Sequence, residues 1–515
     1  MRFVDRYLNL ILTILFIVAA WCFWSLKYPC ALAYQEQLQM FLFDSDYLME
    51  RLIVPGGIAR YVAEFLVQMY NNVYIGGAIL TLLYLLIQQL VWFVGKKECG
   101  IKNIGYALSF FPSMSLWYYM GNENMKHTFI IALIFALIAM LLYPSRGTKG
   151  RKIIYVLIAT PLLYYLAGPT VLVFALYVLA KEIFMSHDWL IACITIAWSV
   201  ACIIISIPLV AQPTYRLFYG INYSLIIDSF PKMQYAVMLL TAFTPIIIAS
   251  IRTEVKGLNV KGAMTYLAYL CVIFFCGVIV PLNYPSNKYD VIEYDYLMRA
   301  QRWQQIVDKA EKKEAHSPLS AATYNLALGM TGHMGRAMQF TQNGWYGAFP
   351  PFNKIYLSSL MTNEIYWHVG LVNTSQRFAF EAMEAIPDNN KSSRIVKRLA
   401  ETNLVNGQYG VAMKYLRLLQ KTMFYGKWAN KTMALLDDEE AINNHPLYGT
   451  LRQFRLDEDF LFSEGELDKI LGHLVMHNVN NNLAIQYLLL LPQLEGNQQK
   501  YMMYMDFVQK KLKEE

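Results

Sequence analysis

Three carboxylic acids lie close together soon after the first hydrophobic segment of the sequence. Glu36 stands in YQEQ at 34–37, and Asp44 and Asp46 stand in DSD at 44–46. A carboxylate in this position can act as a general base that takes a proton from a hydroxyl group. We therefore predict Glu36, Asp44 and Asp46 as catalytic residues. Because surface helices often carry such acids in plain ion pairs, a purely structural role is the alternative.

Residues that could bind a substrate occur in the same region and in two later loops. Arginine suits phosphate because its guanidinium fork matches two phosphate oxygens at once. GNENMKH at 121–127 places donors, acceptors and both charge signs between two apolar segments. The loop at 211–232 is rich in aromatic residues, which could also be an ordinary interfacial belt. The predicted substrate-binding residues are Arg51, Arg60, Asn122, Glu123, His127 and Arg216.

No cofactor or metal is expected from the sequence. It contains no metal-ligand spacing, no glycine-rich phosphate loop and no nucleophile elbow. Five of the seven cysteines fall inside apolar segments, and none follows Cys276. This distribution fits neither a disulfide framework nor a zinc site.

The composition indicates a membrane protein. The 515 residues are 56% hydrophobic and 16% charged, and the mean hydropathy is +0.31, which is too apolar for a soluble protein of this size. Apolar segments of the length that crosses about 30 Å of hydrocarbon occur only before residue 285. We predict about nine transmembrane helices, at 7–28, 73–95, 104–120, 127–144, 153–168, 169–185, 189–209, 233–251 and 263–283.

Alternate loops between these segments differ in charge, and this difference sets the predicted orientation. One set carries thirteen basic and five acidic residues, and the other carries six and seven up to Tyr284. By the positive-inside rule the first set is cytoplasmic. We expect a bacterial inner membrane protein with a cytoplasmic amino terminus and a periplasmic carboxy-terminal domain. Because residues 285–515 hold 25 basic and 25 acidic residues, the net charge of +7 gives no support to nucleic-acid binding.

The first outer loop, 29–72, is predicted to hold two amphipathic helices. Apolar residues share one arc of a helical wheel in 41–53 and one stripe in 58–69, and Pro-Gly-Gly at 55–57 separates the two segments. Such helices can lie flat in the membrane interface with their apolar faces toward the lipid.

The polar faces of these two helices are expected to point away from the membrane. On the first helix Asp44 and Arg51 would lie close together. On the second helix Arg60 and Glu64 have the i,i+4 spacing of an ion pair.

Residues 285–515 are predicted to form a separate α-helical domain. LVNTSQRFAFEAMEAI at 371–386 and LVNGQYGVAMKYLRLL at 404–419 align without gaps at an offset of 33 residues, a spacing typical of helix-turn-helix repeats. A further copy is visible in GHMGRAMQF, where Gly332 precedes Ala337 by five residues. The second stretch resembles a tetratricopeptide repeat through Leu399, Ala400, Gly407, Tyr409, Ala412 and Leu416. That resemblance implies a helical solenoid that binds a peptide or a protein partner, and a cap over the membrane part is the alternative.

Within this domain, two groups of polar residues are interpreted as structural. Glu364, Tyr366, Trp367 and His368 are predicted to form a buried helix seam. The acidic run at 437–440 is predicted to be a solvated helix start.

The order of these parts resembles the GT-C class of membrane glycosyltransferases. The likeness is one of layout: a first span, a long outer loop with QEQ and DSD, many further spans and an exported domain. It implies an acid of the first outer loop as catalytic base and a polyprenyl-phosphate-linked sugar held among the spans. The whole chain is also similar to an uncharacterised family of polytopic Bacteroidetes-type membrane proteins, through YQEQLQMF, DYLMERL, PGGIARY, GNEN and FAFEAMEAIPDNNKS.

The sequence therefore predicts an all-α protein, with a transmembrane helix bundle at 1–284 and an exported helical repeat domain at 285–515. One functional hypothesis is a GT-C-like glycosyltransferase that uses a polyprenyl-phosphate-linked sugar at the outer face of the membrane. The alternative is a non-enzymatic, membrane-anchored repeat scaffold for envelope protein assembly. The two differ in one feature, because a transferase needs a lipid-sized cavity near the DSD loop.

Overall fold

The chain forms two compact helical units. The computed structural model describes residues 2–99, 103–226, 230–251, 260–284, 286–334, 344–388, 390–457 and 464–514. In these ranges the regular structure is helical, and one isolated antiparallel bridge joins Met125 to Ser224. The N-terminal unit comprises 1–36 and 43–285. The C-terminal unit comprises 286–515 together with six residues of the first outer loop, Gln37–Leu42, which we call the strap.

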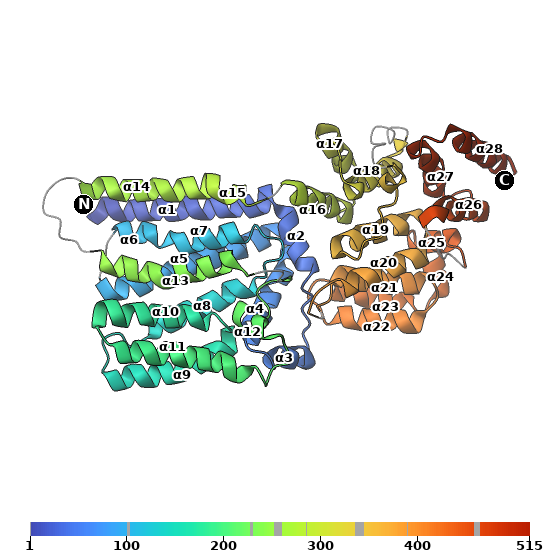
Figure 1. Ribbon diagram of the computed structural model, residues 1–515. Coiled ribbons are helices and arrows are strands. Elements are labelled where there is room, and N and C mark those ends of the chain that lie inside the picture. The colour runs from blue at the N-terminus through green and yellow to red at the C-terminus, as the bar shows by residue number, and fades with distance from the viewer. Residues whose placement is uncertain are drawn as a thin grey trace. The chain divides into compact units, whose positions relative to one another are not determined.

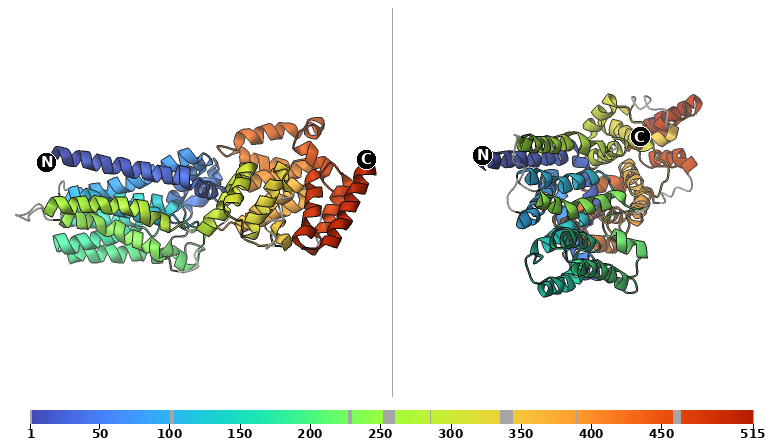
Figure 2. Two further views of the ribbon diagram at one scale, coloured as in Figure 1. Left: turned by 90° about the horizontal axis from the view of Figure 1, so that it is seen from above. Right: turned by 60° about the vertical axis from the view of Figure 1, so that its left-hand side comes forward.

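The N-terminal unit is a bundle of apolar helices. Figure 1 shows its long helices, coloured blue to green, lying side by side with roughly parallel axes, and both views of Figure 2 agree. Three of them continue into a π-helical turn: η1 (Phe23–Lys27), η3 (Glu182–Ser186) and η4 (Phe275–Ile279). The helices are α1 (Arg2–Cys22), α2 (Pro29–Gln37), α3 (Ser45–Leu52), α4 (Gly57–Val67), α5 (Val73–Cys99), α6 (Asn103–Leu108), α7 (Phe110–Tyr119), α8 (Thr128–Leu142), α9 (Lys149–Ala167), α10 (Val171–Lys181), α11 (Trp189–Ser206), α12 (Thr214–Tyr219), α13 (Lys232–Ser250), α14 (Val260–Phe274) and α15 (Val280–Leu282), with a 3-10 turn η2 (Gln68–Asn71).

The number of helices that could cross a membrane is smaller than the sequence predicts. Over the described ranges, four are long and apolar enough: Tyr7–Lys27, Val73–Glu98, Trp189–Ser206 and Lys232–Ser250. A fifth span results if Tyr266–Leu282 is counted together with Asn287–Arg299. The prediction of about nine spans is therefore corrected to four or five.

The other predicted segments form helices that lack the length or the composition of a span. With 15 residues, α8 is about 22 Å long at 1.5 Å per residue, against about 30 Å of hydrocarbon. The segment at 104–120 is divided at Ser109 into two short helices, and α10 ends after 11 residues. α9 has 19 residues but carries three basic side chains in its first turn. Four spans would put the two ends of the membrane part on the same side of the membrane, and five would put them on opposite sides. The predicted orientation therefore stays a prediction.

The first outer loop forms two short helices, α3 and α4, that pack against one another across a tight turn. Gly56 adopts a φ of +83°, where a side chain would be strained, and its N–H donates to the carbonyl of Tyr165 at 2.9 Å. Gly57 is in close contact with the end of α3, because an added Cβ would lie 1.7 Å from the carbonyl oxygen of Arg51. The two glycines therefore allow α4 to fold back onto α3. The predicted start at residue 41 is wrong, since α3 begins at Ser45.

The C-terminal unit is a succession of helices in which neighbours along the chain pack together, from α17 to α23 and again from α26 to α28. Figure 1 shows this order in yellow to red. Its hydrophobic core includes the fully buried Tyr324, Phe349 and Tyr487. The helices are α16 (Ser286–Arg299), α17 (Trp303–Lys312), α18 (Pro318–Thr331), α19 (Tyr356–Val369), α20 (Val372–Glu384), α21 (Ser393–Val405), α22 (Tyr409–Gln420), α23 (Gly426–Leu435), α24 (Glu439–Asn443), α25 (Tyr448–Phe454), α26 (Leu467–His477), α27 (Asn482–Leu494) and α28 (Gln498–Glu514), with a 3-10 turn η6 (Glu464–Glu466).

The two aligned stretches occupy equivalent second helices, α20 and α22. Asn406 donates from its amide to the amide oxygen of Asn373, 33 residues earlier, at 2.7 Å, so the repeated LVN residues meet in space. Gly407 adopts a φ of +73° in the turn before α22, as the repeat pattern requires. The turns are not in register, because α20 begins one residue after Leu371 whereas α22 begins five residues after Leu404. Ala337 of the further copy lies outside the described ranges, and membership in the tetratricopeptide class stays a prediction.

Replacing Gly57 with alanine should destabilise the N-terminal unit, because the new Cβ would collide with the backbone at the end of α3. We expect Gly57→Ala to lower the free energy of unfolding by about 1–3 kcal/mol, measured as a lower thermal midpoint of the full chain in detergent. Gly150→Ala is the control, since a Cβ there meets no atom within 4 Å and alanine favours the helix. Equal midpoints for the two variants would contradict the described turn.

Candidate functional site

The three acids predicted as catalytic lie in different surroundings. Glu36 is on α2 and is buried, with 5% of its surface exposed. Asp44 precedes α3, where its carbonyl accepts the N–H of Leu48 at 3.2 Å. Asp46 lies in the first turn of α3 and is exposed. The strap, which belongs to the other unit, separates Glu36 from both aspartates in the chain. A catalytic role for these acids stays a prediction.

Two of the arginines predicted to bind substrate take part in an ion cluster between α3 and α4. Glu64 is at its centre and is 1% exposed. Its carboxylate accepts hydrogen bonds from Nε of Arg51 at 3.0 Å, from Nε of Arg60 at 2.7 Å and from the hydroxyl of Tyr47 at 2.6 Å. The predicted i,i+4 pair of Arg60 and Glu64 is therefore confirmed.

The expectations for the other charged residues of this loop are corrected. Arg51 pairs with Glu50 at 2.8 Å and with Glu64, rather than with Asp44. The polar faces do not all point outward either, because Arg51 and Glu64 are buried. The physical reason is the turn at Gly56, which brings the polar face of α4 against α3.

The surroundings of Glu64 keep its carboxylate charged. Burial alone would raise the pKa of Glu64, but Arg60 and Arg51 lower it below its ordinary value. Burial and the neighbouring carboxylate raise the pKa of Tyr47, and the Arg51 guanidinium stacks 3.7 Å above the Tyr47 ring. With its bonds completed in this way, the cluster holds the two helices together and does not present a free base.

Three loops of the N-terminal unit, all predicted to be on the outer side, are joined by hydrogen bonds. The Gln35 amide, beside Glu36, donates to the carbonyl of Glu123 at 2.8 Å, which joins α2 to the GNENMKH loop. The bridge between Met125 and Ser224 joins that loop to the loop at 211–232. Asn122 is exposed at this junction and Glu123 is half-buried. The structure thus brings together loops whose residues were predicted to form one site, without assigning them a reaction.

His127 occupies the residue before α8 and is 1% exposed. Its ring meets the ring of Tyr70 edge to face, with 5.0 Å between the centroids. Burial lowers the pKa of His127 to about 3, so the imidazole is neutral. In the part of the chain that the structure describes, neither ring nitrogen has a hydrogen-bond partner. Arg216 lies on α12, in the neighbouring loop, and is partly buried.

The strap carries the first outer loop into the C-terminal unit. It begins at the last residue of α2 and has no helical structure after Leu38, and the N–H of Met40 donates to the carbonyl of Lys391 at 3.0 Å. The amide oxygen of Gln37 accepts a hydrogen bond from Arg394 at 2.8 Å. Its buried apolar side chains are Leu38, Met40, Phe41 and Leu42. Phe41 and Leu42, which were predicted to begin an interfacial helix, are therefore non-helical and belong to the C-terminal unit.

Arg394, on α21, is the centre of a second buried ion cluster. It donates to both carboxylate oxygens of Asp295 at 3.0 and 3.1 Å and to Glu364 at 3.0 Å. Arg398 donates to the other oxygen of Glu364 at 2.6 Å. Burial would raise the pKa of Glu364, but Arg398 and Arg394 hold it well below its ordinary value. Of the predicted buried seam, Glu364, Tyr366 and Trp367 are buried, whereas His368 is partly buried.

A third ion cluster joins α5, α9 and α10. Glu182 is fully buried and accepts hydrogen bonds from Lys152 at 2.8 Å and from the hydroxyl of Tyr143 at 3.0 Å. Lys181 pairs with Glu98 at 2.8 Å. In the sequence, Lys152 and Lys181 served only to predict which loops are cytoplasmic. In the structure, they form ion pairs with Glu182 and Glu98.

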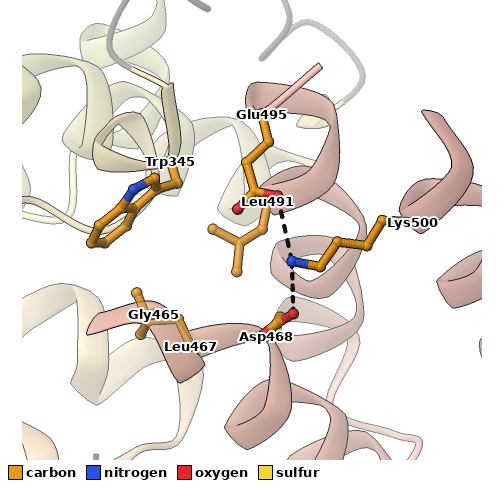
Figure 3. Close-up of a pocket in the computed structure, with 7 residues that line it drawn as sticks. All are labelled: Trp345, Gly465, Leu467, Asp468, Leu491, Glu495 and Lys500. Carbon is orange, nitrogen blue, oxygen red and sulfur yellow. Dashed lines mark hydrogen bonds and ion pairs between the residues drawn. The ribbon is translucent and has the colours of Figure 1, made fainter. Parts of the chain in front are cut away.

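A pocket in the C-terminal unit combines an aromatic wall with an ion triad (Figure 3). Its cavity volume is about 80 Å³. Trp345 forms one wall, and on the other side Lys500 bonds Asp468 at 2.7 Å and Glu495 at 3.4 Å. Although burial opposes it, Lys500 lowers the pKa of Asp468. Because its charges are already paired, this pocket offers a ligand mainly the Trp345 ring. The other lining residues are Gly465, Leu467 and Leu491.

Comparison with known proteins identifies the family. A family model described as "Family of unknown function (DUF6057)" matches residues 6–514. The chain belongs to DUF6057. No curated protein and no solved structure matches it. Within the described ranges of this DUF6057 chain, no group of three His, Cys, Asp or Glu side chains could hold a metal ion.

Some contacts in these clusters can be predicted from the sequence, and others cannot. The pairing of Arg60 with Glu64 follows from helical spacing alone. Tyr47 and Tyr70 carry no such signal, because their partners come from other elements. Arg394 is 357 residues from Gln37, so no local pattern connects them.

Removing the charge of Glu64 should destabilise the DUF6057 chain, because two buried guanidinium groups would lose their shared partner. We expect Glu64→Gln to cost about 3–5 kcal/mol of stability, seen as a lower thermal midpoint or reduced abundance of the full chain. Glu50→Gln is the matched control, since the Glu50 side chain is 71% exposed and its loss should cost no more than about 1 kcal/mol. If the Glu64→Gln protein were as stable as wild type, the ion cluster would not stabilise the packing of α3 on α4.

The stability of the C-terminal unit should fall in mild acid because of His368. Burial lowers the pKa of His368 to about 4, below its ordinary value near 6.5. Between these values the unfolded chain binds a proton that the folded chain does not, so stability decreases as the pH falls from about 6.5 to about 4. His368→Gln should therefore show a smaller loss of thermal midpoint between pH 7 and pH 5 than wild type. His316→Gln, which changes an exposed side chain, should keep the wild-type pH dependence, and an unchanged profile in both variants would refute the role of His368.

Proposed function

We propose that this protein is a non-enzymatic, membrane-anchored helical scaffold for the assembly of envelope proteins. The observation that carries the proposal is the placement of the strap. The strap lies in the chain between the candidate bases Glu36 and Asp44 and belongs to the C-terminal unit, where its Gln37 accepts a hydrogen bond from the buried Arg394. This use of the loop favours a structural role over a reactive one.

The state of the candidate acids and arginines supports the same proposal. Arg51 and Arg60 are bound to Glu64, so neither presents a free fork to a phosphate group. Asp46 is exposed at the start of α3, and Glu36 is buried on α2. The pocket of Figure 3, with its Trp345 wall, belongs to the C-terminal unit and not to these outer loops.

The C-terminal unit offers surface for a protein partner. Of the described side chains on its last helix, α28, Val508 is buried, whereas Met502 and Met503 are 51% and 56% exposed. Exposed methionines adapt to different partner surfaces because the side chain is flexible and polarisable. We infer that the partner is an envelope protein on the side of the membrane that holds the C-terminal unit.

A second candidate function is a transferase that uses a polyprenyl-phosphate-linked sugar. It is favoured by the meeting of α2, the GNENMKH loop and the loop at 211–232, since a site built from these loops needs this juxtaposition. In that case Glu36, Asp44 or Asp46 would act as base, and Arg216 or His127 would contact the phosphate.

One genetic experiment separates the two functions. A strain lacking the protein is complemented with wild type or with the triple variant Glu36→Gln, Asp44→Asn, Asp46→Asn, and protein abundance is matched by immunoblot. The scaffold proposal expects envelope glycans to be unchanged in the deletion strain, the envelope proteome to change, and the triple variant to restore it fully. Mass spectrometry measures both.

The contrary result is equally clear. Altered glycans in the deletion strain, restored by wild type but reduced by about two to four orders of magnitude in the triple variant at equal abundance, would establish the transferase instead.

A further inference from the structure

Three buried polar groups, at the start of α8 and in the turn η2, have no hydrogen-bond partners in the described ranges. They are both ring nitrogens of His127, the hydroxyl of Thr128 and the hydroxyl of Tyr70. His127 is 1% exposed, and Thr128 and Tyr70 are fully buried. Buried polar groups are almost always hydrogen-bonded in folded proteins, and leaving one unsatisfied costs about 1–3 kcal/mol. A group of three therefore points to a bound polar partner.

These groups come from two elements that the fold holds together. His127 and Thr128 begin α8, and Tyr70 lies in η2, which follows α4. The His127 and Tyr70 rings are in edge-to-face contact at 5.0 Å, and α4 packs on α8. Gln68, in the same turn as Tyr70, also has a buried amide nitrogen without a partner among the described residues.

The charges around this position favour an anion. The first turn of α8 contains no acidic residue, and no side chain caps its first N–H groups. A helix start of this kind carries a partial positive charge. The buried acid of α4, Glu64, is already paired with two arginines.

The arrangement of donors favours a phosphate group over a carboxylate. An imidazole, two hydroxyls and an amide can donate here, and they come from two different elements. A phosphate group carries at least two unesterified oxygens with several lone pairs arranged in three dimensions, whereas a carboxylate presents two oxygens in one plane. The tetrahedral group can therefore use donors from both elements at once.

We propose that the start of α8, with His127, Thr128 and Tyr70, is a binding site for the phosphate group of an anionic ligand. The phosphate comes either from a lipid headgroup or from a small soluble phosphate compound. This site goes beyond the scaffold function and does not depend on it.

The test uses the purified full chain in neutral detergent and three probes: phosphatidic acid, inorganic phosphate, and diacylglycerol as the phosphate-free control. Thermal midpoints are measured against probe concentration for wild type, Tyr70→Phe and Thr128→Val. Each variant removes only a hydroxyl that has no protein partner in the described ranges, so folding should be unaffected. Tyr177→Phe is the matched control, because it removes another buried hydroxyl without a described partner, from α10.

Phosphatidic acid should raise the midpoint of wild type, whereas diacylglycerol should not. The half-saturating concentration should rise about tenfold in Tyr70→Phe and in Thr128→Val, the loss expected for one hydrogen bond to a charged group. Tyr177→Phe should bind as wild type does. A response to phosphatidic acid alone assigns the site to a lipid headgroup, and an equal response to inorganic phosphate assigns it to a soluble ligand. The proposal is overturned if wild type responds to neither phosphate probe, or if Tyr70→Phe and Thr128→Val bind as tightly as Tyr177→Phe.

Discussion

The buried guanidinium of Arg394 is the interaction on which the arrangement of the chain depends. A buried charge is tolerated only when its donors are satisfied, and Arg394 achieves this with Asp295, Glu364 and the amide oxygen of Gln37. One of these acceptors comes from a loop that begins and ends in the N-terminal unit. The chain therefore passes between the two units three times rather than once, and the C-terminal unit contains a segment that lies far from the rest of it in the sequence.

The same physical principle recurs in the N-terminal unit. Glu64 is buried between two arginines, and Glu182 is buried against a lysine and a tyrosine hydroxyl. In both cases the carboxylate accepts hydrogen bonds from a cationic side chain and from a tyrosine hydroxyl, and these partners come from different elements. Such clusters fix the packing of neighbouring helices, since removing either partner leaves an uncompensated charge. They also explain why several charged residues that look reactive in the sequence are not available to a substrate.

Sequence patterns over a few neighbouring residues predicted the features of the structure that depend on neighbouring residues. Apolar runs located helices of the bundle, and helical spacing located the pair of Arg60 and Glu64. The offset of 33 residues relates Asn373 to Asn406, whose side chains are hydrogen-bonded. The number of spans was not predictable in this way, because hydropathy does not show that a run is divided at Ser109 or stops after 15 residues, as in α8. The strap was not predictable either, since its partner in Arg394 is hundreds of residues away and no repeat or spacing relates the two.

The start of α8 differs from the three ion clusters in a way that bears on function. Each cluster brings opposite charges together within the protein and pairs its buried carboxylates with cations, which is the pattern of a structural contact. At His127, Thr128 and Tyr70 the described protein supplies donors and positive potential but no acceptor for them. A sequence that closes its buried ionic groups elsewhere would gain stability by closing these too, for example with an acid in the first turn of α8. That this acid is absent is understandable if the acceptor is a ligand, because a carboxylate at that position would compete with it.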